Sequence, residues 1–175
     1  MDRLFIGELF VVSLALGACA SSFFPADVMN EVDPNIDFET LKAKPELYKG
    51  RAVQLAGRII DVEQTQKGPL IEARSLPIRN NQPVESLMQR DQPGGKFVAF
   101  FPGTMSSDDL EIGNVFLVVG QLQEEQKASL KTIAPIGQLY LIARCLHVWE
   151  NGRYSVAEYP DIKEHYVVAH TYCSR

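Results

Sequence analysis

The sequence predicts a mainly β protein: a small closed barrel of five strands, with a short helix before the first strand and a C-terminal extension after the last. Three observations support this fold class. Five segments have the alternation or the continuous apolar character of strands, glycines and prolines separate them, and a single segment ahead of them has helical spacing. Because a sandwich usually needs about seven strands, five strands favour a closed barrel.

The chain ahead of the strands is expected to form a tether and then a helix. Residues 19–35 lack helical or strand periodicity and contain Pro25 and Pro34, so they are predicted to be a tether. Apolar residues then recur at mixed helical spacing, at Ile36, Phe38, Leu41 and Leu47. We therefore expect a short helix that is interrupted near Pro45.

The first two strands follow from period-two alternation. In the first strand the positions on one face are Val53, Leu55, Gly57 and Ile59. A glycine inside a strand marks a bulge or a tight bend, so we expect one at Gly57. The second strand is predicted over 70–76, and a long polar loop containing prolines follows it over 77–95.

The third strand is predicted over 96–101, where alternation places Phe97 and Phe101 on one face and Phe100 on the other. The fourth strand, over 115–123, is almost continuously apolar, which is typical of a buried strand. These strands supply much of the expected core.

The fifth strand is predicted over 138–150 and ends the barrel domain, 36–150. Alternation divides its side chains between two faces. One face is expected to carry Leu139, Leu141, Ala143, Cys145 and His147. The other face is expected to carry Tyr140, Ile142, Arg144 and Leu146.

The segment 109–120 is similar to the fourth-strand pattern of barrels of the oligonucleotide-binding (OB) type. The predicted fold is therefore an OB-like closed barrel, a term that describes shape and does not imply a nucleic-acid ligand. The formal net charge of −5 also argues against nucleic acid, because binding to phosphates requires basic surfaces.

The C-terminal extension, 151–175, contains four of the six tyrosines of the chain. We expect it to pack back on the barrel, with an extra strand near 165–172, and to cover an aromatic side chain on the outer face of the third strand. The alternative is an exposed aromatic surface for a partner or a glycan.

The N-terminus carries Leu16-Gly17-Ala18-Cys19, which is typical of a bacterial lipoprotein signal. The apolar run over 9–16 is far shorter than the roughly 20 residues of a membrane-spanning helix, so residues 1–18 are predicted to be a cleaved signal peptide. Cleavage between Ala18 and Cys19 would leave Cys19 as the lipid-modified first residue. The alternatives are an ordinary secretory signal and an apolar N-terminal helix in which Cys19 is incidental.

The residues after Cys19 are Ala20 and Ser21, so the aspartate that usually signals retention in the inner membrane is absent. The expected location is the outer membrane, through an N-terminal lipid that includes an acyl chain such as palmitate, with the barrel on the periplasmic side. Removal of residues 1–18 would leave 157 residues, which suit a single domain.

Two cysteines remain for the folded domain, Cys145 and Cys173. In an oxidising periplasm they can form one disulfide that ties the last barrel strand to the C-terminus. Cys145 lies in an apolar stretch, so a buried free thiol is the alternative.

The sequence predicts no metal and no cofactor. The candidate ligands are His147, His165, His170 and Cys173, and no pair of them has the close spacing of a recognisable zinc motif.

The sequence also predicts that the protein is not an enzyme. Ser106 and Ser107 lie outside any nucleophile motif and are expected in a solvated turn or a helix cap. Paired acids that would suit glycan cleavage are Asp108, Asp109, Glu111, Glu124 and Glu125. Acids in turns are usually only solvated, so we expect no catalytic residue.

An alternative function is a periplasmic module that binds a small ligand or an oligosaccharide. Its expected binding face consists of Phe97, Phe101, Arg144 and Trp149. Such a module would contact cell-wall glycan or envelope proteins.

Several sequence blocks resemble the Slp family of outer-membrane lipoproteins. The blocks are 45–59, with Tyr48-Lys49-Gly50 leading into a strand, 71–78 followed by Pro83, 94–97, and 140–149. The chain departs from the family where Lys96 replaces an arginine and where Ile142 and Ala143 replace an aromatic residue and proline.

This resemblance implies a lipid-anchored, non-enzymatic protein of the cell envelope, often associated with stationary phase or envelope stress. It implies no agreed ligand. It therefore indicates where the protein is located more firmly than what it binds.

Overall fold

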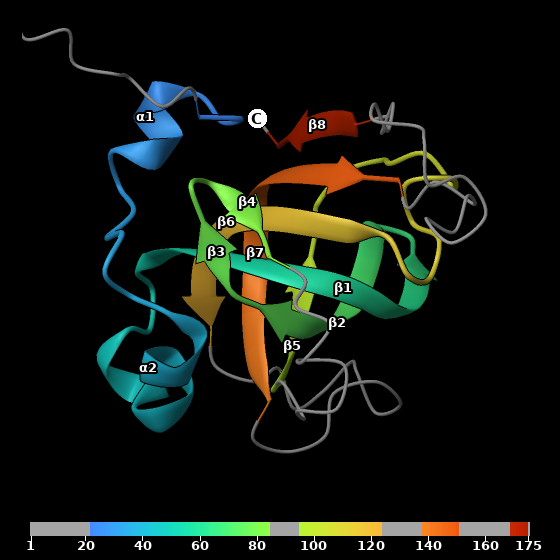
Figure 1. The fold of residues 1–175 in the computed structure, drawn as a ribbon. Helices are drawn as coiled ribbons and strands as arrows, with labels where there is room; N and C mark the ends of the chain where they lie inside the picture. Colours follow the sequence, from blue (N-terminus) through green and yellow to red (C-terminus); the bar gives the residue numbers. More distant parts are fainter. Residues whose placement is uncertain (1–21, 85–94, 124–137, 151–168, 175) are drawn as a thin grey trace, which may run out of the picture.

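The computed structural model describes residues 22–84, 95–123, 138–150 and 169–174 (Figure 1). The barrel strands are β1 (Ala52–Thr65), β2 (Gly68–Leu76), β5 (Lys96–Phe100), β6 (Val115–Gln123) and β7 (Leu139–Trp149). The other elements are the helices α1 (Ala26–Met29) and α2 (Phe38–Ala43), the 3-10 turn η1 (Pro45–Leu47), the hairpin of β3 (Ile78–Arg79) and β4 (Gln82–Pro83), and the strand β8 (Ala169–Cys173).

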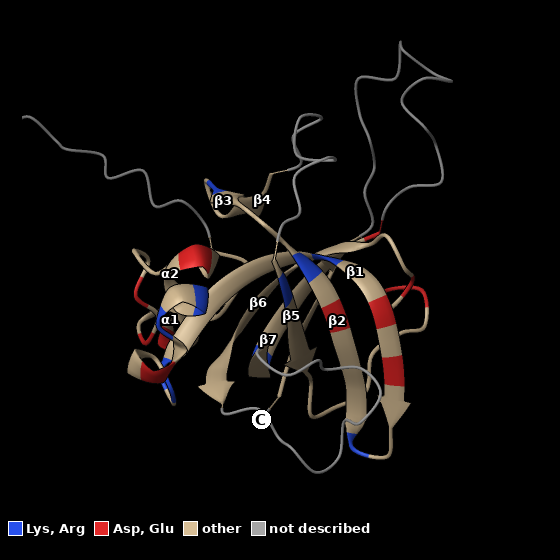
Figure 2. Cartoon of the chain, turned by 90° about the horizontal axis from the view of Figure 1, so that it is seen from below, with Lys and Arg blue, Asp and Glu red and all other residues tan. Residues whose placement is uncertain are grey.

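The predicted closed five-stranded barrel is confirmed. The strands pair antiparallel in the order β5-β2-β1-β6-β7, and β5 then pairs with β7 in parallel, which joins the two ends of the sheet. β8 adds to the outer edge of β7. Both helices lie on one side of the molecule, and the turn between β1 and β2 lies on the opposite side (Figures 1 and 2).

The barrel interior is organised around Phe97, which is fully buried between Phe38 and Phe116. Gly57 faces this ring, and a Cβ atom there would lie 3.0 Å from Phe97 and 2.8 Å from the Cβ of Ala73. Gly57 pairs in continuous register with Ser75 on β2 and with Phe116 on β6, so the bulge, one of the two features expected at Gly57 beside a tight bend, does not lie there. The bulge in β1 lies between Ile59 and Asp61, and Gly57 instead leaves space for the phenylalanine ring.

The assignment of the two faces of β7 is wrong beyond Ala143. Val119 pairs with Cys145 and Gly120 pairs with Ala143, so Arg144 is an extra residue in β7. This bulge shifts the alternation by one residue. Leu146 and Val148 pack in the barrel core, whereas Cys145 lies in a separate cluster on the outer face.

Gly120 is necessary at this bulge. A Cβ atom on Gly120 would lie 2.4 Å from the carbonyl oxygen of Ile142 and 2.9 Å from the Cα of Ala143. Both contacts are with backbone, which cannot move aside as a flexible side chain can. The close approach of β6 to the bulged part of β7 therefore depends on the missing side chain.

The predicted short helix before the first strand is confirmed as α2 and η1. The Asp37 carboxylate accepts a hydrogen bond from the Thr40 amide at 2.8 Å, which caps the helix and lowers the pKa of Asp37. Phe38 and Leu41 are buried and belong to the barrel core, so α2 covers the end of the barrel at which β5 begins.

The expectation of a tether over 19–35 is wrong for its described part. Residues 22–35 form an N-terminal segment that contains α1 and packs on the outside of the barrel. Phe24 and Val28 are each only 4% exposed and contact the cluster that contains Cys145. A helix of four residues is too short to produce a periodic pattern in the sequence.

Replacing Gly57 should test the packing of the barrel interior. We expect Gly57→Val to destabilise the fold by about 3 kcal/mol, because the added methyl groups overlap Phe97. Gln121→Val, at an exposed strand position, is the control and should have little effect. Urea denaturation followed by circular dichroism measures the stability of both variants. Equal unfolding midpoints for the two would contradict the role of Gly57 in leaving space for the ring of Phe97.

Candidate functional site

The predicted binding face does not exist as an accessible surface. Phe97 is 0% exposed and Phe101 is 3% exposed, because both point into the barrel. Arg144 and Trp149 are partly exposed on the outer side of β7. The four residues are therefore divided between the core and the outer surface, and the prediction is wrong.

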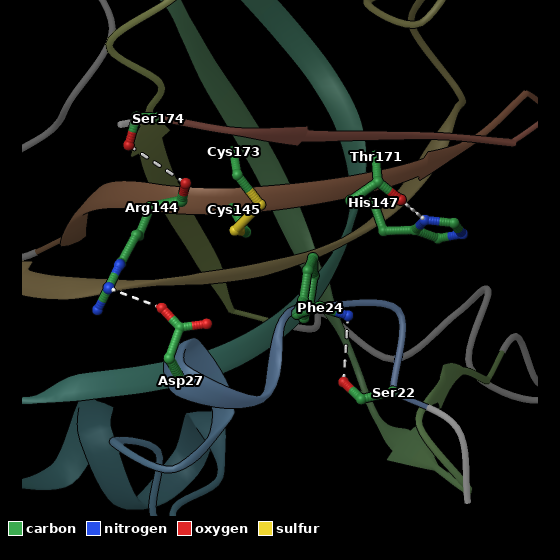
Figure 3. Close-up of a disulfide and its surroundings, with 9 residues drawn as sticks. All are labelled: Ser22, Phe24, Asp27, Arg144, Cys145, His147, Thr171, Cys173 and Ser174. Atoms are coloured by element: carbon green, nitrogen blue, oxygen red, sulfur yellow. Dashed lines mark hydrogen bonds and ion pairs between the residues drawn. A yellow bond between two sulfur atoms is a disulfide. The ribbon is translucent and has the colours of Figure 1, made fainter.

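Cys145 and Cys173 form a disulfide (Figure 3). They lie directly opposite each other on β7 and β8, with a Cα–Cα distance of 4.1 Å. The sequence left a free thiol at Cys145 as the alternative, and the structure resolves the choice. The bond attaches the C-terminal strand covalently to the barrel, and the Ser174 amide extends this attachment by donating to the Arg144 carbonyl at 2.8 Å.

The N-terminal segment lies on the same outer face of β7 as this disulfide. Phe23 stacks on His147 with a centroid distance of 4.1 Å and meets Trp149 edge-on at 5.2 Å. Phe24 packs in the cluster of Cys145 (Figure 3). The predicted lipidation and cleavage residues, Ala18 and Cys19, lie outside the described residues but shortly before these contacts.

Arg144 projects from the bulge toward the N-terminal segment. Its guanidinium donates to Glu31 at 2.8 Å and to Asp27 at 3.5 Å, and the hydrogen bond to Glu31 raises the pKa of Arg144. Both ion pairs are exposed, so each contributes little to stability. Beside them is a groove of about 330 Å³, whose lining includes Val28, Gly120 and Ser174.

A second group of polar side chains meets at the end of the barrel where β5 stops. Leu146 pairs with Tyr172 and Val148 pairs with His170, and cross-strand partners share a face of the sheet. Since Leu146 and Val148 face the core, His170 and Tyr172 extend over the barrel end. We call these two residues, together with Asp109 and Glu150, the Asp109 cluster.

Asp109 is the centre of this cluster and is fully buried. Tyr172 donates its hydroxyl hydrogen to Oδ2 of Asp109, and Nδ1 of His170 lies 3.1 Å from Oδ1. The side-chain amide of Asn114 donates to the carbonyls of Asp108 at 2.7 Å and Asp109 at 3.1 Å, which holds the loop before β6 in place. The carboxylate of Asp109 is thus fixed by two side chains of β8, and its backbone is fixed by Asn114.

The two described histidines of β7 and β8 differ in their electrostatic environment. The hydrogen bond from His170 to Asp109, together with the charge of that carboxylate, raises the pKa of His170 above its usual value of 6.5. Burial lowers the pKa of His147 below the same value, and the charge of His170 lowers it further. Burial, followed by the hydrogen bond to Asp109, raises the pKa of Tyr172.

The sequence did not group the residues of the Asp109 cluster. Sequence patterns place Asp109 among the acids that would suit glycan cleavage, and they place His170 among the candidate metal ligands with His147, His165 and Cys173. Asp109 and His170 are 61 positions apart, so no local spacing connects them. The cluster exists because the bulge at Arg144 determines which residues of β7 and β8 face the barrel end.

The cluster has the donors to hold a cation. Asp109, Glu150 and His170 offer ligand atoms that all lie within 4.8 Å of one another. Of the other sequence candidates, Ser107 donates to Asp108 at 3.2 Å in an exposed turn, and Glu124, Glu125 and His165 lie outside the described residues.

An NMR titration of the two histidines should separate them. We expect the imidazole of His170 to titrate above 6.5 and that of His147 to titrate below 6.5. The His170–Asp109 ion pair stabilises the fold while His170 is protonated, so this contribution is lost as the pH rises through the raised pKa of His170. Asp109→Asn should shift the titration of His170 downward and leave His147 nearly unchanged, whereas identical titrations for both histidines in the unmodified protein would contradict this electrostatic account.

Among the described residues, no helix combines the length and the apolar composition needed to cross a membrane. No curated protein and no solved structure gives a significant match to the chain. A family model described as the outer membrane lipoprotein Slp family matches residues 16–173. Because this match extends over most of the chain, from Leu16 in the predicted lipoprotein signal to Cys173 of the disulfide, the protein belongs to the Slp family of outer membrane lipoproteins.

Proposed function

We propose that this protein is a non-enzymatic envelope protein, anchored by lipid on Cys19, whose barrel is held against the periplasmic face of the outer membrane. Family membership supports the location, and Leu16-Gly17-Ala18-Cys19 lies within the matched region. The anchor is made of several acyl chains, which hold a protein far more firmly than a single chain does. A role in stationary phase or envelope stress is consistent with this family.

The packing of the N-terminal segment carries this proposal. Phe23, only four positions after Cys19, already stacks on His147, and Phe24 is buried. Four extended residues reach at most about 14 Å. The outer face of β7 would therefore lie close to the lipid headgroups, unlike a domain on a long linker that reaches into the periplasm.

The burial and the hydrogen bonds of Asp109, a candidate acid for glycan cleavage, support a non-enzymatic role. Asp109 is fully buried among the described residues and is engaged by His170 and Tyr172, so its carboxylate is not open to a sugar chain there. Two acids that flank a glycosidic bond must stand on either side of an open cleft. The arrangement around Asp109 suits structural fixation better than glycan cleavage.

A second candidate function is binding of a small ligand, in a groove that shares only Arg144 with the binding face expected from the sequence. The groove of about 330 Å³ beside Arg144 is within the range of sites for small molecules. A ligand carboxylate would replace Glu31 or Asp27 as the partner of the guanidinium. This function would place binding beside the membrane anchor.

The mass of the protein extracted from membranes tests the anchor. We expect a mass above that of residues 19–175 by a diacylglycerol and an acyl chain, because the thiol of Cys19 carries the lipid. Cys19→Ser should remain unprocessed, and Cys173→Ala, the control, should still be acylated. An unmodified, water-soluble wild-type protein would contradict the proposal and favour a diffusing periplasmic module.

The single tryptophan of the chain reports the distance of the barrel from the membrane. Trp149 packs against Phe23, so its fluorescence should be quenched when the acylated protein is reconstituted in vesicles with spin-labelled headgroups. Inserting about 20 Gly and Ser residues between Ser21 and Ser22 should greatly reduce this quenching while acylation is retained. Equal quenching with and without the insertion would show that the short connection does not position the barrel.

A further inference from the structure

The Asp109 cluster brings together three potential metal ligands from three separate parts of the chain. Asp109 comes from the loop before β6, Glu150 directly follows β7, and His170 lies on β8. The side chain of Asp109 is fully buried, and that of His170 is 51% exposed. An ion could therefore reach the cluster from solvent and be held against a buried carboxylate.

The distance between the ligand atoms of His170 and Asp109 suits a single small divalent ion, and the ligand atom of Glu150 lies within 4.8 Å of both. A tetrahedral zinc ion with bonds of about 2.0–2.1 Å keeps its ligand atoms about 3.3 Å apart. Nδ1 of His170 and Oδ1 of Asp109 are already 3.1 Å apart. An ion between these two atoms would replace their hydrogen bond with little movement of either strand or loop.

The supporting residues hold the ligands in place. Tyr172 donates to Oδ2 of Asp109, which leaves Oδ1 directed at His170. The disulfide at Cys173, three positions after His170, attaches β8 to the barrel, and Asn114 holds the loop of Asp109. Hydrogen bonds to ligating carboxylates are typical of the groups that surround a metal centre.

The charge of the cluster also favours a cation. Asp109 and Glu150 supply two carboxylates, and within the described residues that form the cluster only His170 can balance them by protonation. A divalent ion would neutralise both carboxylates and would take the lone pair of neutral His170. Calcium would need about six to eight oxygen ligands, whereas one nitrogen and two carboxylates suit zinc.

We propose that Asp109, Glu150 and His170 form a binding site for a divalent transition-metal ion of the zinc type, with solvent at the remaining coordination position. The site stands apart from the proposed lipid anchor. Cys173 is bonded to Cys145 on the outer face of β7, where the N-terminal segment packs, whereas His170 points to the opposite face of β8. Bound metal would join the C-terminal strand to the loop before β6 at the barrel end.

Zinc binding to the chelator-treated mature protein, measured by isothermal titration calorimetry with zinc chloride, tests the site. We expect one zinc ion per chain. Asp109→Asn and His170→Asn should each weaken binding by at least tenfold, and Tyr172→Phe, which removes only the supporting hydroxyl, should weaken binding by about tenfold. Circular dichroism confirms that each variant remains folded.

His147→Gln is the matched control, because His147 lies on the outer face of β7 and hydrogen bonds to Thr171 at 2.6 Å. It should retain the full zinc affinity. A second readout is the absorption spectrum of the cobalt-substituted protein, which should show tetrahedral bands that His170→Asn abolishes. No zinc binding by the wild-type protein, or unchanged binding in both Asp109→Asn and His170→Asn, would overturn the proposal.

Discussion

The single extra residue in β7 is the constraint on which the rest of the structure depends. The bulge at Arg144 reverses the alternation of the strand, so that Leu146 and Val148 fill the core and Cys145 faces outward. A strand without this bulge would direct Cys145 into the barrel and Leu146 and Val148 away from it. The missing side chain of Gly120 allows the backbone of β6 to approach the bulge closely.

The first and the last described segments, residues 22–35 and 169–174, are both attached to the barrel through β7. The N-terminal segment packs on its outer face through Phe23 and Phe24, and β8 pairs with its edge and is bonded to it at Cys145. A disulfide that closes a loop of 28 residues contributes about 3 to 4 kcal/mol through the entropy of the unfolded chain. The N-terminal segment from residue 22 onward is thus part of the folded domain, and this is the feature on which the proposed position of the barrel at the membrane depends.

Family membership describes the place of the protein in the cell, and the structure identifies where its chemistry is concentrated. The outer face of β7 carries aromatic packing and exposed ion pairs, and both attach the N-terminal segment to the barrel. The barrel end carries Asp109, a buried carboxylate held by Tyr172 and His170, and buried charges of this kind are uncommon unless they are paired or bind metal. These two surfaces lie on opposite sides of β7, because successive side chains of the strand point to opposite faces of the sheet.

The sequence by itself determined the number and order of the barrel strands and the short helix ahead of them, because each of these rests on a local pattern of neighbouring residues. Only the tertiary structure decided which side chains of β7 face the core, since a bulge is defined by the partner strand and leaves no local pattern. The same is true of Gly57, which accommodates a ring 40 positions away, and of Asp109 and His170, which meet across 61 positions. Sequence periodicity cannot report contacts whose geometry depends on strand register.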